Sequence, residues 1–521
     1  MDHASEARRL IAAAADLTLA DVMRTQAVVR PRADALVADA VTLSYGELDA
    51  RTERIASGLL GIGLRRGDRL AVLSRNSLEY ALLFHSAAKA GIAIAALNWR
   101  SAPAELARAV ALVEPAAVAV SGELRGVADE VAPSLRKVLL DRPAEDGAVA
   151  FAELEKSQPV PLEARAEDIV SIVFTSGTTG DPKAVAISQR ALIARAGVIG
   201  VDWSLEASDA FVGWAPLFHI SSSDYLFTTT VLSGVFVVVD GFDAEKIAAI
   251  VRERKIGWLF LVPGTFEKMI EALGEAPLPP GQVKVVGVMA DLAPPAVIEK
   301  LSEMTGAPFL NSFGMTETGL LPCSPSFVRS RDEAELTLPK KQSALASIRL
   351  VGEDGSDVAE GEPGEMWVRS QTVASGYWNN DEATCRAYAG GWYHTGDVMR
   401  RRPDGTLQFV GRLSGMIKSG GENIYPAEIE RALLSHPDVT EAAAIGMAHP
   451  RWGETPLAFV SLAEGARCGA DELKAHLAGL IASYKIPGEI RVIGLSDFPR
   501  NVTGKVDRKA LMGRFADGLA R

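Results

Sequence analysis

The sequence predicts an α/β protein with a large N-terminal domain of mainly parallel sheets flanked by helices, an antiparallel β subdomain, and a small α+β C-terminal domain. Three observations lead to this fold class. Helices alternate with short buried strands over roughly the first 340 residues, short hairpin-like segments follow, and a compact mixture of helix and strand begins near residue 411. The 521 residues, 48% of them hydrophobic, suffice for two or more domains that each bury a core of their own.

The N-terminal part repeats a helix followed by a buried strand. Residues 45–61 carry apolar side chains at helical spacing with charges between them, and Gly61 and Gly63 suit the end of that helix. The strand "GDRLAVLS" follows directly. Residues 244–256 likewise form a predicted helix that leads into the apolar "GWLFLVP". Repeated helix-to-strand connections of this kind favour parallel sheets covered by helices.

The pattern changes after about residue 340. "ASIRLVGEDG", "GEMWVRS" and "GTLQFVGR" are short, alternate apolar with polar residues, and are bounded by Gly, Asp or Pro, as is typical of antiparallel hairpins. At 411–415, "GRLSG", a strand ends and two glycines bracket a serine. We therefore predict an N-terminal domain over 1–410 and a C-terminal domain over 411–521.

Composition excludes several classes of function. A net charge of -12 repels a phosphate backbone, so nucleic acid is not an expected partner. Cys323, Cys385 and Cys468 are too widely spaced for a disulfide framework or a CxxC metal site, which favours the reducing cytoplasm. The apolar run 231–240 is too short to span a membrane and is interpreted as a buried strand, so no integral membrane association is expected. Residues 7–20 are interpreted as a first helix rather than a signal peptide, because acidic residues flank or interrupt their apolar run.

A loop rich in Gly, Ser and Thr follows one of the predicted strands and ends on Lys183, in "IVFTSGTTGDPK". The backbone N–H groups of such a loop can bind anionic oxygens. It is not the GxxxxGK[ST] loop of other nucleotide-binding proteins, because Gly177 and Gly180 are too close together, Pro182 intervenes and Ala184 follows the lysine. The loop therefore predicts a phosphate site of a different kind.

This loop resembles the AMP-binding signature of the adenylate-forming superfamily, which contains acyl-CoA synthetases, peptide-synthetase adenylation domains and luciferases. The resemblance continues in order along nearly the whole chain, through "LSYGELD", "AKAGIAIAALN", "APLFHISS", "NSFGMTET", "WYHTGD", "GRLSGMIKSGGENIYPAEIE" and "PRNVTGKVDRKAL". It implies an enzyme that joins a carboxylate to AMP with ATP and Mg²⁺, and then passes the acyl group to a thiol. It also implies that the small C-terminal domain is mobile.

The resemblance assigns the phosphate and metal chemistry. Lys505 would bridge the carboxylate and the α-phosphate as charge develops, Thr316 would touch the α-phosphate, and Glu317 would hold Mg²⁺ through oxygen ligands, together with Thr175. The loop residues that would bind the β- and γ-phosphates are Thr175, Ser176, Gly177, Thr178 and Thr179, with Lys183 in support.

The resemblance also implies a nucleotide site. The segments beside adenine would contribute Ala290, Asp291, Asn311, Ser312, Phe313 and Gly314. Phe313 replaces the usual tyrosine, which keeps a stacking face and drops a hydroxyl. Asp397 would accept hydrogen bonds from both ribose hydroxyls, and Arg412 would support the same nucleotide.

The acyl and thiol sides are assigned in the same way. His219 stands where the family places an aromatic gate between the acyl pocket and the thiol tunnel; a catalytic base is the alternative, but no paired acid is evident. Lys418, Gly420 and Gly421 would line the pantetheine tunnel of coenzyme A. Trp452 either stacks on the adenine of coenzyme A or is a core residue.

Three departures from the family pattern bear on specificity and motion. Ser414 and Gly415 replace the charged pair usual at the hinge, and the glycine frees the backbone to swing. Met289 stands where many relatives have glycine, so it is expected to shorten or reshape the acyl pocket. Gly314 stands where acetate-specific relatives have tryptophan, which indicates an acid larger than acetate.

The leading prediction is an acid–CoA ligase that uses ATP, Mg²⁺ and coenzyme A on a small-molecule carboxylic acid, of medium chain length or aromatic. "HISS" lacks the Phe-Asp pair that holds amino-acid substrates. The alternative is an enzyme that loads an acyl carrier protein, and a non-catalytic nucleotide-binding regulator is a third possibility, disfavoured by Lys505, Glu317 and Asp397 together. The sequence leaves the oligomeric state open, and a dimer is compatible with it.

Overall fold

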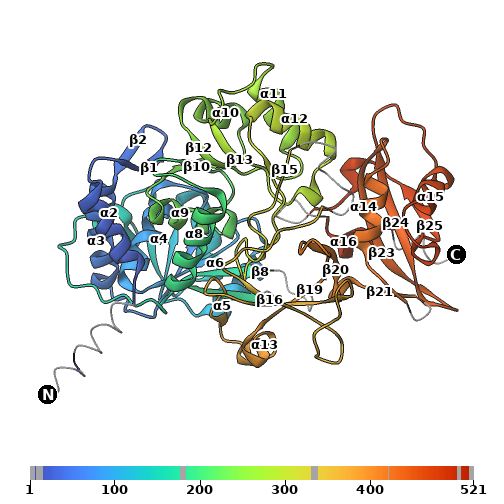
Figure 1. The fold of residues 1–521 in the computed structure, drawn as a ribbon. Helices are drawn as coiled ribbons and strands as arrows, with labels where there is room; N and C mark the ends of the chain where they lie inside the picture. Colours follow the sequence, from blue (N-terminus) through green and yellow to red (C-terminus); the bar gives the residue numbers. More distant parts are fainter. Residues whose placement is uncertain are drawn as a thin grey trace.

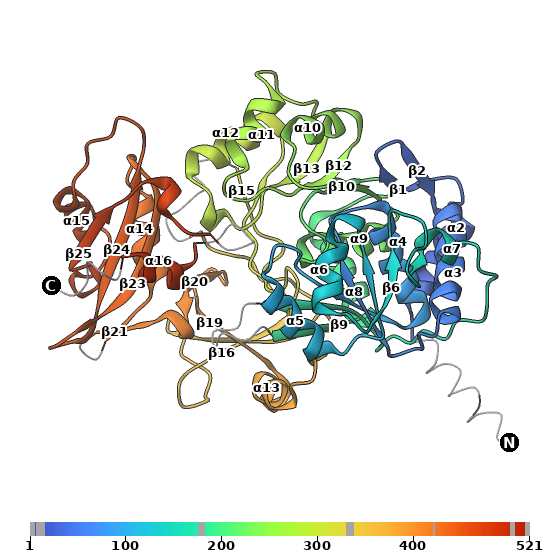
Figure 2. The same cartoon turned by 180° about the vertical axis from the view of Figure 1, so that it is seen from behind.

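Two units lie side by side in the computed structural model, which describes Glu6 and residues 16–175, 183–329, 338–419, 422–500 and 506–515. The large unit runs from the blue N-terminal helices to the yellow and orange strands, and the smaller one holds the red end of the chain (Figure 1). The same division is seen from behind in Figure 2. This architecture confirms the predicted fold class.

The first sheet of the large unit has eight strands among the described residues, in the order β15-β14-β13-β12-β10-β11-β1-β2. Its central pairs are parallel and its two end pairs, β1 with β2 and β14 with β15, are antiparallel. Its strands are β1 (Asp34–Ala38), β2 (Val41–Ser44), β10 (Ala210–Gly213), β11 (Val235–Val238), β12 (Ile256–Leu259), β13 (Val283–Val286), β14 (Phe309–Leu310) and β15 (Phe327–Val328). The helices that precede or connect them are α2 (Leu19–Val29), α8 (Gln189–Trp203), α9 (Ile220–Val231), α10 (Ala244–Glu253), α11 (Phe266–Leu273), η2 (Ala290–Leu292) and α12 (Pro295–Thr305).

The second sheet has the order β18-β9-β8-β4-β3-β5-β6-β7 and is parallel from β8 to β7. Its strands are β3 (Arg69–Leu73), β4 (Ala93–Ala96), β5 (Ala117–Val120), β6 (Arg136–Leu139), β7 (Val149–Ala150), β8 (Ile169–Thr175), β9 (Lys183–Ser188) and β18 (Gly376–Tyr377). Its helices are α3 (Tyr45–Gly61), α4 (Leu78–Ala90), α5 (Pro103–Val113), η1 (Gly122–Leu124), α6 (Arg125–Val131) and α7 (Phe151–Leu154).

Local signals explain where these elements begin and end. Helix α3 has the predicted bounds because Ser44 and Glu47 form a reciprocal capping box at its start. Gly63 lies just beyond its end with a φ of +108°, a conformation that favours glycine. The apolar run 231–240 contains the buried strand β11, as predicted. Of the predicted first helix, residues 7–15 lie outside the described residues, and α2 begins at Leu19.

The antiparallel part and the C-terminal unit follow. An antiparallel sheet contains β16 (Ser347–Val351), β17 (Pro363–Arg369), β19 (Tyr393–Arg401) and β20 (Leu407–Arg412), with α13 (Asp381–Ala387) and η3 (Ala389–Gly391) before β19. After η4 (Leu413–Gly415), the last sheet has the order β22-β21-β24-β23, with β25 beside β24. Its elements are β21 (Ile417–Ser419), β22 (Glu422–Ile424), α14 (Pro426–Leu434), β23 (Val439–His449), β24 (Gly453–Leu462), α15 (Ala470–Ala478), η5 (Ser483–Lys485), β25 (Glu489–Val492), η6 (Leu495–Asp497) and α16 (Arg508–Phe515). The predicted hairpins are therefore confirmed.

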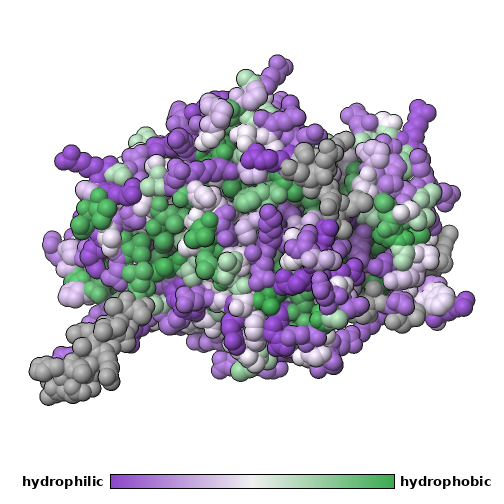
Figure 3. Space-filling model, in the orientation of Figure 1, coloured by the Kyte–Doolittle hydropathy of each residue, from purple (hydrophilic) through white to green (hydrophobic). Residues whose placement is uncertain are grey.

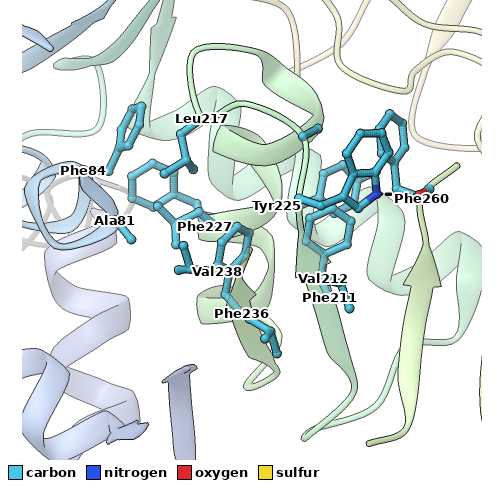
Figure 4. Packing of buried hydrophobic residues seen from close by; sticks show 14 of the residues in the cluster. Ala81, Phe84, Phe211, Val212, Leu217, Tyr225, Phe227, Phe236, Val238 and Phe260 are labelled. Carbon is cyan, nitrogen blue, oxygen red and sulfur yellow. Dashed lines mark hydrogen bonds between the residues drawn. The ribbon is translucent and has the colours of Figure 1, made fainter. Parts of the chain in front are cut away.

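Aromatic side chains on two opposite sides of helix α9 pack in the main core. The Phe227 ring meets Phe84 of α4 edge-on at 6.0 Å between centroids, and the Tyr225 ring stacks on Phe211 of β10 at 4.7 Å. Figure 4 shows these two groups on opposite sides of the helix. Aromatic contacts at such distances add to the burial energy of the rings. The packing fixes α9, and with it His219, which is the N-cap residue of the helix.

The outer surface is mainly hydrophilic, with apolar side chains in small groups on the face shown in Figure 3. In the part of the chain that the structure describes, no helix combines the length and the apolar character that crossing a bilayer needs.

Candidate active site

Several predicted site residues follow the carboxyl ends of strands in the large unit. Strand β8 ends at Thr175, η2 with Ala290 and Asp291 follows β13, and Asn311 follows β14. Ligands of α/β proteins bind at this edge of a sheet. Seven predicted residues lie outside the described residues: Ser176, Gly177, Thr178, Thr179, Gly420, Gly421 and Lys505.

A chain of contacts joins the end of the phosphate loop to the predicted metal ligand. Lys183 Nζ lies 4.8 Å from the centroid of the Tyr377 ring. The Tyr377 hydroxyl donates a hydrogen bond of 2.9 Å to Glu317 Oε1. Burial, and then the Glu317 charge, raise the pKa of Tyr377, so the phenol remains a donor at neutral pH. Thr175 is the strand partner of Lys183, so the structure brings these predicted residues together.

A buried arginine fixes the segment that carries Thr316. Arg195 of α8 is 3% exposed and donates to the carbonyl oxygens of Thr316 and Thr372, both at 3.0 Å. It also pairs with Asp224 of α9 at 2.7 Å. Burial raises the pKa of Asp224, against the opposing effect of the Arg195 charge. The sequence analysis did not identify Arg195, although an arginine on the apolar face of α8 is a signal for a buried charge with a partner.

Backbone contact gives Gly314 a structural reason to be glycine. A Cβ atom at this position would lie 2.0 Å from the carbonyl oxygen of Gly319, because Met315 and Gly319 form a bridge that closes a tight turn. Any side chain would therefore require this turn to move. The turn is thus a local reason for glycine at this position, and the expectation of an acid larger than acetate stays a prediction.

The predicted adenine segments meet at a buried lysine that the sequence analysis missed. Lys340 Nζ lies 2.5 Å from Asp291 Oδ2 and 2.6 Å from Asn311 Oδ1, and its side chain is 1% exposed. The Asn311 amide donates to the Leu338 and Pro339 carbonyls at 3.2 and 3.0 Å. One cation thus fixes side chains from two loops that follow neighbouring strands. In "LPKKQS" two lysines are adjacent, and nothing in the sequence says which one is buried.

The neighbouring residues of this segment are also buried. The Phe313 ring is 9% exposed and tilts against Phe409 of β20, with 5.7 Å between the ring centroids. Ser312 is fully buried, and its hydroxyl has no hydrogen-bond partner among the described residues. A buried hydroxyl without a partner is costly, so a bound ligand that supplied one would be favoured.

Asp397 and Arg412 form a pair across two strands. They are register partners in β19 and β20, and Arg412 Nε donates to Asp397 Oδ1 at 2.8 Å. The Asp397 side chain is 1% exposed, whereas that of Arg412 is 58% exposed. Arg412 therefore contacts the buried Asp397 carboxylate from the solvent side and fixes its position.

His219 accepts rather than donates at Nδ1. The Ser221 backbone N–H lies 3.2 Å from this nitrogen and the Ser221 hydroxyl 2.8 Å from it. A nitrogen that already accepts the backbone N–H is not free to remove a proton. Nδ1 is therefore not available as a base, and the gating role of His219 stays a prediction.

Residues predicted to meet coenzyme A lie on the surface of the C-terminal unit. Trp452 is 43% exposed, with the Arg451 guanidinium carbon 4.4 Å from its ring centroid. Trp452 is therefore not a core residue, which removes that alternative. Lys418 is exposed, and its backbone N–H donates to Glu454 Oε2 at 2.8 Å.

Met289 has a left-handed backbone, with a φ of +46° and a ψ of +81°. This conformation favours glycine and costs a larger residue roughly 1–2 kcal/mol. The side chain is half-buried and packs against the main core. Contacts with the core thus hold a methionine at this position, and its effect on the acyl pocket stays a prediction.

The link between the two units runs through η4. β20 ends at Arg412 in the antiparallel sheet, and β21 begins at Ile417 in the last sheet. Gly415 is exposed, with no atom within 4 Å of where its Cβ would be. Tyr425 of the C-terminal unit packs on Gly411, where a Cβ would lie 2.5 Å from the tyrosine ring.

The side chains present suit the substrates and the metal ion that the resemblance implies. The half-buried Glu317 carboxylate and the Thr175 hydroxyl are oxygen donors, which Mg²⁺ prefers. The buried Asp397 carboxylate suits a ribose diol, and the unpartnered Ser312 hydroxyl lies in the predicted nucleotide segment. Fold and site together define a nucleotide-dependent enzyme of two units.

Comparison with known proteins identifies the family. The chain belongs to the AMP-binding enzyme family, whose model matches residues 23–378, and the AMP-binding enzyme C-terminal domain matches residues 428–505. It is 33% identical to the indoleacetate–CoA ligase of Aromatoleum aromaticum over 89% of this chain and 91% of the relative. It is 32% identical to a feruloyl-CoA synthase of an Amycolatopsis species over 94% and 97% of the two chains. The solved o-succinylbenzoate CoA synthetase of Bacillus subtilis, in complex with its acyl-adenylate, matches with a TM-score of 0.80 at 26% identity, covering 94% of this chain and 97% of that one.

Proposed function

We infer that this protein is an ATP-dependent carboxylic acid–CoA ligase. In the first half-reaction the acid and ATP give an acyl-adenylate and pyrophosphate, and in the second the acyl-adenylate and coenzyme A give acyl-CoA and AMP. The observation that carries this inference is the similarity to acid–CoA ligases along nearly the whole chain. The contacts of Tyr377 with Lys183 and with Glu317 support it.

The substrate we propose is an aromatic acid. The relatives are named for indoleacetate and for the feruloyl group, and the solved structure holds a succinylbenzoyl adenylate. His219 at the start of α9 and Met289 beside the adenine segment are the residues we expect to limit the length of the acyl group. A medium-chain acid is the alternative.

We propose the following roles for residues of the chain. Glu317 and Thr175 hold Mg²⁺, which when bound offsets negative charge on the phosphates, and Asp397 binds the ribose. We place the domain boundary at residue 411, so that the C-terminal domain brings Lys505 to the reacting carboxylate. Lys505→Ala is expected to lower the rate of adenylate formation by about 10²- to 10³-fold, as for the loss of one charge-stabilising donor. Adenylate formation near the wild-type rate would refute this role.

Coenzyme A is the acceptor we propose, rather than an acyl carrier protein, and the cytoplasm is the proposed compartment. All three cysteines are free thiols, and Cys323 and Cys468 are buried. Free thiols are typical of proteins in a reducing compartment.

The test is a panel of acids assayed for AMP release. Indoleacetate, ferulate, benzoate, octanoate and acetate are each supplied with ATP and Mg²⁺, with coenzyme A or with a holo-carrier protein. We expect the highest kcat/KM with an aromatic acid and coenzyme A. A preference for octanoate would replace the aromatic proposal, and release that needs the carrier protein would overturn the acceptor.

A further inference from the structure

Asn76 links the two large sheets at the edge where ligands of α/β proteins bind. It lies in the short loop between β3 of the second sheet and α4. Its amide nitrogen donates to the carbonyl oxygens of Gly213 at 3.1 Å and of Val239 at 3.0 Å. Gly213 is the last residue of β10, and Val239 directly follows β11, in the first sheet. One buried side chain thus joins the carboxyl ends of strands from both sheets.

The same amide holds the segment between β10 and α9, residues 214–219. Its nitrogen also donates to the Ala215 carbonyl oxygen at 2.8 Å, and its oxygen accepts the Leu217 backbone N–H at 2.8 Å. Asn76 therefore contacts this segment at two points, one before and one after Pro216. A segment held on both sides of a residue in this way has little freedom to shift.

The segment leads directly into His219. The His219 backbone N–H donates to the Pro216 carbonyl at 3.0 Å, and His219 is the N-cap residue of α9. The Ser222 hydroxyl of α9 donates to the Ala215 carbonyl at 2.7 Å, which is the same oxygen that Asn76 contacts. The position of His219 therefore depends on a turn that Asn76 holds from the other sheet.

An amide is the side chain that this place in the fold needs. Asn76 is 8% exposed, and its nitrogen faces carbonyl oxygens while its oxygen faces an N–H group. A primary amide has donors on one atom and an acceptor on the other, which matches these partners. A carboxylate would place an oxygen against the carbonyls, and an apolar side chain would leave buried polar groups unpaired.

We propose that Asn76 is a positioning residue for the carboxylic acid substrate, which it affects through residues 214–219 and His219. The proposal rests on the proposed function, which places His219 beside the acyl group. The residues proposed for the nucleotide lie on other elements, with Asp397 in β19 and Asn311 after β14. Loosening the segment should therefore weaken the use of the acid and leave the use of ATP nearly unchanged.

The first test compares Asn76→Ser with Gln189→Ser, which shortens another buried amide. The Gln189 amide accepts the Leu19 backbone N–H at 2.7 Å and donates to the Ala88 carbonyl at 2.9 Å, so its loss also removes buried hydrogen bonds. The assay is exchange of pyrophosphate into ATP with the acid that gives the highest kcat/KM. Asn76→Ser should raise the KM for that acid by about 10-fold, as for the loss of one or two hydrogen bonds, and leave the KM for ATP within about 2-fold.

Gln189→Ser should change neither KM by more than about 2-fold, because its amide holds α2 and α4. An equal rise in the KM for the acid in both variants, or no rise in Asn76→Ser, would overturn the proposal. Ser222→Ala removes a single bond to the segment and serves if Asn76→Ser does not fold. Its KM for the acid should rise by about 2- to 5-fold, and an unchanged value would overturn the proposal.

The second test asks whether Asn76 acts through His219. The KM for the acid is measured in Asn76→Ser, in His219→Ala and in the double variant. Residues that act through one another are not additive, so the rise in the double variant should not exceed that of the more affected single variant. A rise equal to the product of the two single rises would overturn the proposed route through His219.

Amide hydrogen exchange separates this proposal from the proposed function. The Leu217 amide should exchange at least about 10-fold faster in Asn76→Ser than in the wild-type protein or in Gln189→Ser, because its acceptor is lost. Equal exchange rates would overturn the proposal. If no acid supports pyrophosphate exchange, the proposed function fails, whereas the Leu217 amide still shows whether Asn76 holds the segment.

Discussion

Lys340 gives the sharpest prediction on how the adenine segments are held. Replacing it with methionine removes the cation that lies 2.5 Å from Asp291 Oδ2 and 2.6 Å from Asn311 Oδ1. Breaking a buried ion pair by removing one partner costs roughly 3–5 kcal/mol, because the other charge stays buried without compensation. The Asp291 side chain is 22% exposed, so water solvates it in part. We therefore expect the free energy of unfolding to fall by the lower figure, about 3 kcal/mol.

The assay is urea unfolding at pH 7, together with the KM for ATP. Lys341→Met is the matched control, since Lys341 is adjacent and exposed. Adding Asp291→Leu to Lys340→Met removes both charges and should restore at least half of the lost stability. The KM for ATP should rise in Lys340→Met and in the double variant, because the Asn311 side-chain oxygen has lost the Lys340 ammonium. The reasoning is refuted if Lys340→Met is no less stable than Lys341→Met.

Two further predictions concern the buried His85 and the link between the units. Burial lowers the pKa of His85 to about 4 from an ordinary value of 6.5, so between these values the unfolded chain takes up a proton that the folded chain does not. The free energy of unfolding should therefore fall by roughly 3 kcal/mol from this group as the pH falls from 6.5 to about 4. His85→Gln should flatten that part of the pH–stability curve. An unchanged slope in this variant would contradict the prediction. Gly415→Pro is expected to leave adenylate formation intact and to slow thioester formation, measured in separate single-turnover assays, because a fixed φ restrains the link; an unchanged thioester step would show that Gly415 is not the hinge.

Much of the fold follows from local patterns. Helix α3 is capped by Ser44 and Glu47 and ends before Gly63. These three residues lie at or near the helix ends, so its bounds can be predicted from local sequence. The hairpins of β16, β17, β19 and β20 follow from alternation between turn residues. Their order in a sheet does not, because strand pairing depends on contacts between segments far apart in the chain.

The candidate site divides in the same way. The resemblance to the family predicts roles for Glu317, Asp397 and Asn311, because each lies in one of the matching motifs. It did not identify the partners that hold them, namely Arg195, Tyr377 and Lys340, because each acts through a side chain brought from another element. The close approach of Gly319 to Gly314 is likewise a contact that the motifs do not indicate.

The most direct test of the central claim is acid-dependent exchange of labelled pyrophosphate into ATP, without coenzyme A. The proposed ligase predicts exchange that requires Mg²⁺ and an aromatic acid, and that stops when the acid is withheld. Exchange that proceeds equally without any acid, or none with any acid of the panel while the protein is folded, would contradict the claim that this protein forms an acyl-adenylate.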